Sequence, residues 1–177
     1  GCVTTTKVGK ISTGWNLISC YTNKGTQKQL QEIFEYTASI FDEIMIDDFL
    51  FTDCQCDECK AARGGTSWAD YRCDLMIEMS RDRILAPARA VNPDVVTIIK
   101  YPQWYDNFHN RGYEVLRQTA DFEKIWVGTE TRDYENERWG GKVQYEAYYI
   151  MRWLGLIGGL KTGGGWFDPY GTTEDTY

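Results

Sequence analysis

Stretches rich in β-forming residues alternate along this chain with stretches of helical spacing, and this alternation constrains the fold more than any other feature of the sequence. The expected strands are residues 15–22, 42–51, 95–101, 124–132 and 163–173, and the expected helices are residues 25–41, 67–90, 111–122 and 143–159. Ser67 is the expected N-cap of the second helix, and Asn92-Pro93 is its expected end. Val95–Tyr101 is β-branched and almost continuously apolar, as expected of a parallel strand covered on both faces. Such regular alternation predicts an α/β fold with parallel strands joined by right-handed crossovers.

The ends of the expected strands bear on the choice between an open doubly wound sheet and a TIM-type (β/α) barrel. Polar or aromatic residues close these strands: Tyr21-Thr22, Asp47-Asp48, Lys100-Tyr101, Glu130–Arg132 and Asp168. A barrel gathers such ends on one rim, whereas an open sheet usually carries a glycine-rich phosphate loop after its first strand, which this sequence lacks. A closed barrel takes about 250 residues. We therefore predict a single domain over residues 1–177, an incomplete TIM-type barrel of about five βα units.

The exposed edges and the charge of such a domain indicate which partners to expect. An incomplete barrel has two unpaired strand edges, and exposed edges pair with other strands, which predicts homo-oligomers through open sheet edges. A net charge of −7 without a Lys/Arg cluster argues against nucleic acid. No apolar run approaches the roughly 20 residues that span a bilayer, so we expect no membrane partner. The sequence assigns no compartment.

Acidic residues close two of the apolar strands and are the candidates for catalysis. Asp47 and Asp48 are adjacent carboxylates that repel each other, so one should be paired with a Lys or Arg or have a raised pKa. Glu130 closes a second strand. Cleavage of a glycosidic bond needs two carboxyl groups, about 5–5.5 Å apart for retention or about 6.5–9.5 Å for inversion. The alternatives are a helix-capping aspartate at 47 or 48 and a salt bridge from Glu130 to Arg132 or Lys100.

Basic and aromatic residues beside these strand ends are candidates for binding the substrate. Lys100 could hold a carboxylate ionised or bond to a sugar hydroxyl, and aromatic faces suit stacking against a pyranose ring. The predicted substrate-binding residues are Lys100, Tyr101, Trp104, Arg132, Trp166 and Asp168. For each aromatic residue the alternative is a place in the core.

Four cysteines lie close together in the sequence and predict a structural zinc site. Cys54, Cys56, Cys59 and Cys73 offer four soft ligands within twenty residues, enough for a tetrahedral Zn²⁺ with no open position for chemistry. The alternatives are reduced thiols or a disulfide within the loop.

The acidic strand end, the C-x-C-x-x-C loop and the sequence SWADYR that opens the next helix together resemble (β/α)8-barrel glycoside hydrolases and glycoside hydrolase-like families. Some β-galactosidases have a similar CYCDHC-type loop that binds zinc. FDEIMIDDF also resembles the DGIDxDxE strand of chitinase-like barrels, but Met45 and Phe49 replace two of its acids, which argues against chitinase chemistry. The resemblance covers residues 41–170 and implies that the third to seventh barrel strands are present. It also implies that Asp47 or Asp48 lies on the fourth strand and Glu130 on the sixth.

Together these features predict a glycoside hydrolase that acts on oligo- or polysaccharides without a catalytic cofactor. Asp48 or Asp47 would be the nucleophile or base, and Glu130 the general acid. The alternative is a non-catalytic fragment of a barrel that binds carbohydrate or associates with itself.

Overall fold

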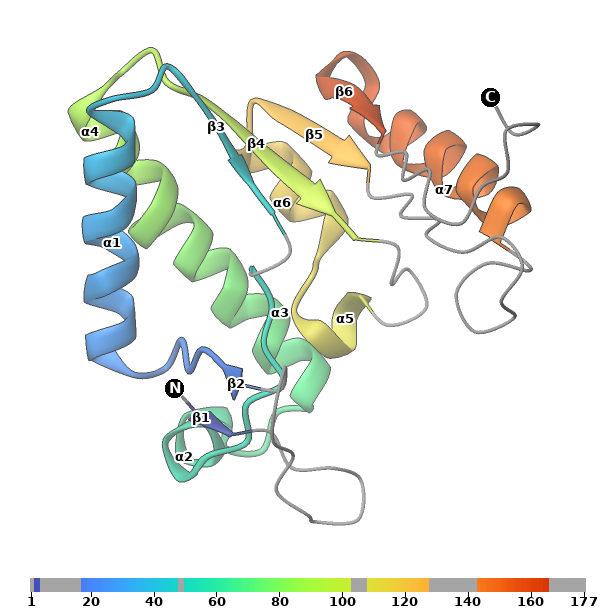
Figure 1. The fold of residues 1–177 in the computed structure, drawn as a ribbon. Coiled ribbons are helices and arrows are strands. Elements are labelled where there is room, and N and C mark those ends of the chain that lie inside the picture. The colour runs from blue at the N-terminus through green and yellow to red at the C-terminus, as the bar shows by residue number, and fades with distance from the viewer. Residues whose placement is uncertain (1, 4–16, 48–49, 103–107, 128–142, 166–177) are drawn as a thin grey trace.

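The computed structural model describes residues 2–3, 17–47, 50–102, 108–127 and 143–165, which form strands and helices in alternation (Figure 1). The strands are β1 (Cys2–Val3), β2 (Leu17–Ile18), β3 (Glu43–Ile46), β4 (Val96–Tyr101), β5 (Lys124–Val127) and β6 (Thr162–Gly165). The helices are α1 (Lys24–Ala38), α2 (Asp57–Arg63), α3 (Trp68–Met79), α4 (Ala86–Val91), α5 (Phe108–Arg111), α6 (Val115–Asp121) and α7 (Val143–Gly158), with a π-helical segment η1 (Ser80–Leu85) and a 3-10 turn η3 (Gly159–Lys161). Within these ranges no helix is long and apolar enough to cross a bilayer.

The central sheet has four strands in the order β3-β4-β5-β6, and all neighbouring pairs are parallel. The predicted α/β fold with parallel strands is therefore confirmed. The expected first strand, residues 15–22, is wrong as a member of this sheet, because its described part, β2, pairs antiparallel with β1 instead. The chain after β2 is used in other contacts: Tyr21 O accepts a hydrogen bond from Gln27 Nε2, and Asn23 caps α1 through its side chain.

The second expected helix, residues 67–90, shows how local sequence sets the limits of an element. Ser67 caps α3 by accepting a hydrogen bond from Asp70 N, as its position predicts. The helical path continues through η1 and α4 and stops at Asn92, where the sequence predicts the end. Pro87, the second residue of α4, has no N–H to donate to the preceding turn, and the widened π segment lies directly before α4.

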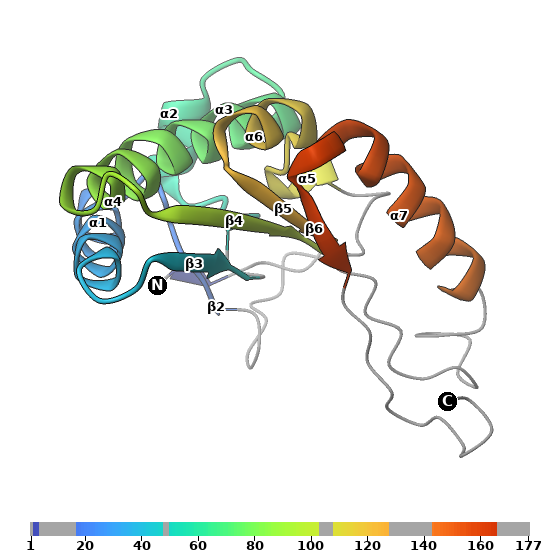
Figure 2. The same cartoon turned by 90° about the horizontal axis from the view of Figure 1, so that it is seen from above.

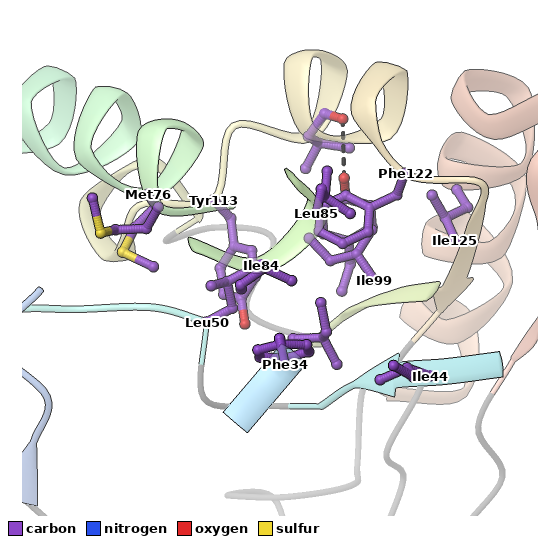
Figure 3. Packing of buried hydrophobic residues seen from close by; sticks show 14 of the residues in the cluster. Phe34, Ile44, Leu50, Met76, Ile84, Leu85, Ile99, Tyr113, Phe122 and Ile125 are labelled. Carbon is purple, nitrogen blue, oxygen red and sulfur yellow. Dashed lines mark hydrogen bonds between the residues drawn. The ribbon is translucent and has the colours of Figure 1, made fainter. Parts of the chain in front are cut away.

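The helices gather on one side of the sheet (Figure 2), and the core lies between the two layers (Figure 3). The buried strand side chains that form this core are Ile44, Ile46, Ile99, Tyr101, Ile125 and Val127. They pack with Phe34 of α1, Met76 of α3 and Leu85 of η1. Successive side chains of a strand point to opposite faces, so Lys100 and Trp126 point to the face away from these helices.

Candidate functional site

The structure brings together two of the predicted site residues, Asp47 and Lys100, at the ends of neighbouring strands. Ile46 of β3 lies opposite Ile99 of β4, so Asp47 and Lys100 are the next residues in register. Lys100 Nζ donates to Asp47 Oδ1 at 2.9 Å. The lysine side chain is 3% exposed, and that of the aspartate is 62% exposed. The partner expected for one of the two adjacent aspartates is thus present for Asp47.

This ion pair places a buried positive charge beneath an accessible carboxylate. Burial of an ammonium group is costly unless an opposite charge and hydrogen bonds compensate it. Asp47 supplies such compensation, and Lys100 in turn favours the ionised form of the Asp47 carboxyl group. Asp47 can therefore present an anionic oxygen to a ligand at the carboxyl edge of the sheet, while the buried Lys100 holds that oxygen in place.

Two further residues continue this register across the sheet. Lys100 lies opposite Trp126 of β5, and Trp126 lies opposite Gly164 of β6. Asp47, Lys100, Trp126 and Gly164 therefore form one transverse row, which we call the cross-strand row. Trp126 was not among the predicted site residues, because its place beside Lys100 depends on the register between β4 and β5.

Tyr101 lies on the opposite face from Lys100, which corrects the expectation that it lines a sugar subsite. Its side chain is fully buried in the core. Its hydroxyl lies 2.9 Å from Thr119 Oγ1 and donates to Val115 O at 3.2 Å. Burial raises the pKa of Tyr101 well above its ordinary value. The physical reason is the two-residue period of a strand, which turns Tyr101 away from its neighbour Lys100.

The remaining predicted catalytic and substrate-binding residues lie outside the described residues. They are Asp48, Trp104, Glu130, Arg132, Trp166 and Asp168. The described chain leaves parallel strands β3, β5 and β6 at the same edge of the sheet, just before Asp48, Glu130 and Trp166 in the sequence (Figure 1).

Four cysteine sulfurs converge where the chain after β2 meets the loop after β3. The Sγ atoms of Cys20, Cys54, Cys56 and Cys59 all lie within 4.8 Å of one another. Cys20 Sγ is 3.6 Å from both Cys56 Sγ and Cys59 Sγ. None of these four cysteines forms a disulfide, so the disulfide alternative is not what the structure shows for them. A tetrahedral ion with sulfur ligands at about 2.3 Å requires S–S separations of about 3.8 Å, and this cluster could therefore hold a metal ion.

Cys73 is not part of this cluster, which corrects the predicted ligand set. It lies on α3, where its thiol approaches His109 O at 3.6 Å, and burial raises its pKa to about 11. Cys20 takes the fourth place, although it precedes Cys56 by 36 residues. Cys20 lies near the end of the expected strand 15–22, and no spacing within the sequence links it to the other three cysteines.

Polar groups around the cluster orient its sulfurs. Thr22 Oγ1 lies 3.1 Å from Cys59 Sγ and 2.7 Å from the Tyr71 hydroxyl. Burial raises the pKa of Cys59 to about 11. Burial acts in the same direction on Cys56, but the backbone N–H of Cys59 and the neighbouring thiols outweigh it and lower the pKa of Cys56 to about 7. Hydrogen bonds of this kind fix the orientation of metal-binding side chains.

A buried arginine ties the cysteine loop to the rest of the domain. Arg72 donates to Asp53 O at 3.0 Å and to Asn110 O at 2.7 Å. Thr52 N donates to Arg111 O at 2.9 Å. The segment between the acidic strand end and the cysteines is therefore fixed to α5, both directly and through Arg72.

Comparisons with known proteins agree with the resemblance drawn from the sequence. The whole chain, residues 1–177, matches the family described as "Probable glycosyl hydrolase, catalytic domain". It is 27% identical over 174 residues to the uncharacterized protein SSO3021 of Saccharolobus solfataricus, in an alignment that covers 86% of this chain and 28% of the relative. The chain thus spans less than a third of the length of that relative. No solved structure matches it. The chain belongs to the family of probable glycosyl hydrolase catalytic domains.

Proposed function

We propose that this chain supplies the catalytic domain for hydrolysis of glycosidic bonds in oligo- or polysaccharides, with two carboxyl groups in the catalytic roles. Asp48 or Asp47 is the nucleophile or base, and Glu130 is the general acid. The observation that carries the proposal is the Asp47–Lys100 pair, at the edge where the chain leaves β3 and β5. Membership of a glycosyl hydrolase family supports the same reaction.

The ion pair also supports a division of roles between the acids. A carboxylate bonded to an ammonium group is a poor proton donor, so Asp47 acts as an anion, either toward the sugar carbon or as a ligand for sugar hydroxyls. Proton donation to the leaving oxygen then falls to Glu130, which follows a different strand. This mechanism requires no cofactor.

We propose further that the domain is of the TIM-barrel type. An open doubly wound sheet has helices on both faces, whereas the described helices gather on one side (Figure 2). Four parallel strands are fewer than a barrel needs. Further strands would therefore pair with the outer edges of β3 and β6.

We propose that Cys20, Cys54, Cys56 and Cys59 bind one Zn²⁺ ion with a structural role. The S–S distances of 3.6 Å fit a tetrahedral thiolate site. Four protein ligands leave no position for substrate, so the ion would pin the chain after β2 to the loop after β3. Zinc would supply stability here, and the carboxyl groups would supply the chemistry.

The test of the hydrolase proposal is a kinetic comparison of acid-to-amide variants. The purified chain is assayed with 4-nitrophenyl glycosides and with plant and microbial polysaccharides. Asp48→Asn and Glu130→Gln should each lower kcat/KM by about 100-fold or more, whereas the control Asp94→Asn, at an exposed loop position, should not. Sugar binding without turnover in the unaltered chain would instead favour the non-catalytic alternative.

A further inference from the structure

The side chains of the cross-strand row follow an order that suits contact with a sugar ring. Asp47 presents a carboxylate, Lys100 an ammonium group and Trp126 an aromatic ring, and Gly164 has no side chain. Neighbouring strands are about 4.8 Å apart, so Lys100 and Trp126 are separated by about the width of one pyranose ring. Polar donors and acceptors thus lie directly beside an aromatic surface.

The glycine at position 164 places no side chain of its own beside Trp126. Gly164 has a φ of 148°, a conformation that disfavours any residue with a Cβ. A Cβ built on it would lie 3.6 Å from Trp126 Cζ2 and 3.7 Å from Cε2, so the indole leans over β6. A Cβ on the next residue, Gly165, would instead meet Met151 of α7. Gly164 therefore faces the same side as Trp126, and Gly165 faces the helices.

We propose that Trp126 is a carbohydrate-binding platform on which one pyranose ring of the substrate stacks, with the exposed Asp47, held in place by the buried Lys100, bonded to a hydroxyl group of that ring. The inference rests on the proposed function, because it assigns the row to the same site as the catalytic acids. It also names the substrate class, a pyranoside with a flat face of C–H groups. The Trp126 side chain is partly exposed.

Trp153 provides a matched control for this platform. It is also a partly exposed tryptophan, but its ring lies on α7, stacked on Phe108 at a centroid distance of 6.2 Å. Trp126→Phe and Trp126→Ala remove part or all of the platform, and Trp153→Phe makes the same chemical change outside the row. Thermal melting of each variant shows whether the fold is retained.

The experiment is calorimetric titration with cellohexaose, xylohexaose, mannohexaose and β-1,4-galactotetraose, each in a Glu130→Gln background that prevents turnover. For the best-bound sugar, Trp126→Ala should weaken binding by roughly tenfold or more, because large aromatic residues dominate such contacts. Trp126→Phe, which keeps a smaller ring, should lose less, and Trp153→Phe should leave the affinity unchanged.

The outcomes separate this inference from the hydrolase proposal. Equal affinities for Trp126→Ala and Trp153→Phe would overturn the platform and leave hydrolysis intact. Binding that depends on Trp126 in a chain without hydrolytic activity would support the platform and overturn the hydrolase. If no sugar of the panel binds more tightly than about 1 mM, the platform is overturned as well.

Discussion

The carboxyl edge of the sheet depends, at the scale of single residues, on a lysine that is almost completely buried. Lys100 is held beside Asp47, and the fold accepts its charge because the carboxylate lies within hydrogen-bonding distance. Tyr101, the next residue along β4, belongs to the core. A difference of one residue along a strand thus separates a candidate site residue from a packing residue.

The cysteine cluster gives a prediction that contrasts two buried cysteines. Cys20→Ser should abolish stoichiometric zinc binding, because a hydroxyl replaces one of four thiolates, whereas Cys73→Ser should retain one zinc per chain. Metal analysis by mass spectrometry of the purified variants measures this directly. Equal zinc content in the two variants, or no zinc in the unaltered chain, would contradict the proposed ligand set.

Glu123 gives a prediction about pH. Although burial acts to raise its pKa, hydrogen bonds from the side chain and backbone N–H of Thr97 and the charge of Arg89 outweigh burial and lower it. A carboxyl group with a lowered folded-state pKa stabilises the fold above its ordinary pKa of roughly 4.3, and this contribution is lost as the pH falls through the lowered value.

Glu123→Gln should therefore destabilise the domain by about 1 kcal/mol at neutral pH, a modest value because the side chain is 35% exposed. Urea unfolding measures the difference, which should shrink steadily as the pH is lowered below roughly 4. A difference that stays constant over this pH range would show that the carboxylate charge is not the cause.

At the scale of elements, the short turn between α5 and α6 depends on a glycine. Gly112 has a φ of 93°, and a Cβ on it would lie 2.6 Å from Met76 Cγ and 3.0 Å from Arg72 O. Gly112→Ala should thus cost about 1–3 kcal/mol through backbone strain and crowding against α3.

A variant at Gly64 separates the cost of backbone strain from the cost of crowding. Gly64 also has a positive φ of 57°, but a Cβ there would meet nothing within 4 Å. Gly64→Ala should therefore cost less than Gly112→Ala in thermal or urea unfolding. An equal cost at both positions would mean that crowding against Met76 contributes nothing.

Local signals in the sequence predict several elements well. Ser67 and Asn92 bound the second helix as expected, because capping depends on neighbouring residues alone. The acidic end of β3 was also predicted, because it too is a local feature of the sequence. The roles of Cys20 and Trp126 and the strand pairing of residues 15–22 were not predicted, because each depends on contacts between distant segments. Register places Trp126 beside Lys100, and no spacing within the sequence states it.

At the scale of the whole molecule, both flanks of the helical layer carry exposed apolar side chains. On and just beyond α1 these are Ile33, Tyr36, Ile40 and Phe41, and on and just beyond α7 they are Tyr148, Tyr149, Leu156 and Leu160. They flank β3 and β6, the outer strands of the described sheet. Apolar surface next to an open sheet edge favours association.

We therefore expect this chain to form homo-oligomers through its two flanks. Sedimentation velocity should show a concentration-dependent increase in mass, which the double variant Leu156→Glu/Leu160→Glu should reduce by placing charge on one flank. A chain that remains monomeric at about 100 μM, well above the micromolar range of weak association, would contradict this expectation.

The central claim is that acids from different strands act on one sugar linkage, and the distance between them tests it most directly. A crystal structure of the Glu130→Gln variant with a bound oligosaccharide gives the separation between the carboxamide carbon at position 130 and the carboxyl carbon of Asp48 or Asp47. The account predicts that both groups flank one glycosidic oxygen, about 5–5.5 Å or about 6.5–9.5 Å apart. Side chains that open onto different surfaces of the protein, with no shared cleft in the monomer or its assembly, would contradict it.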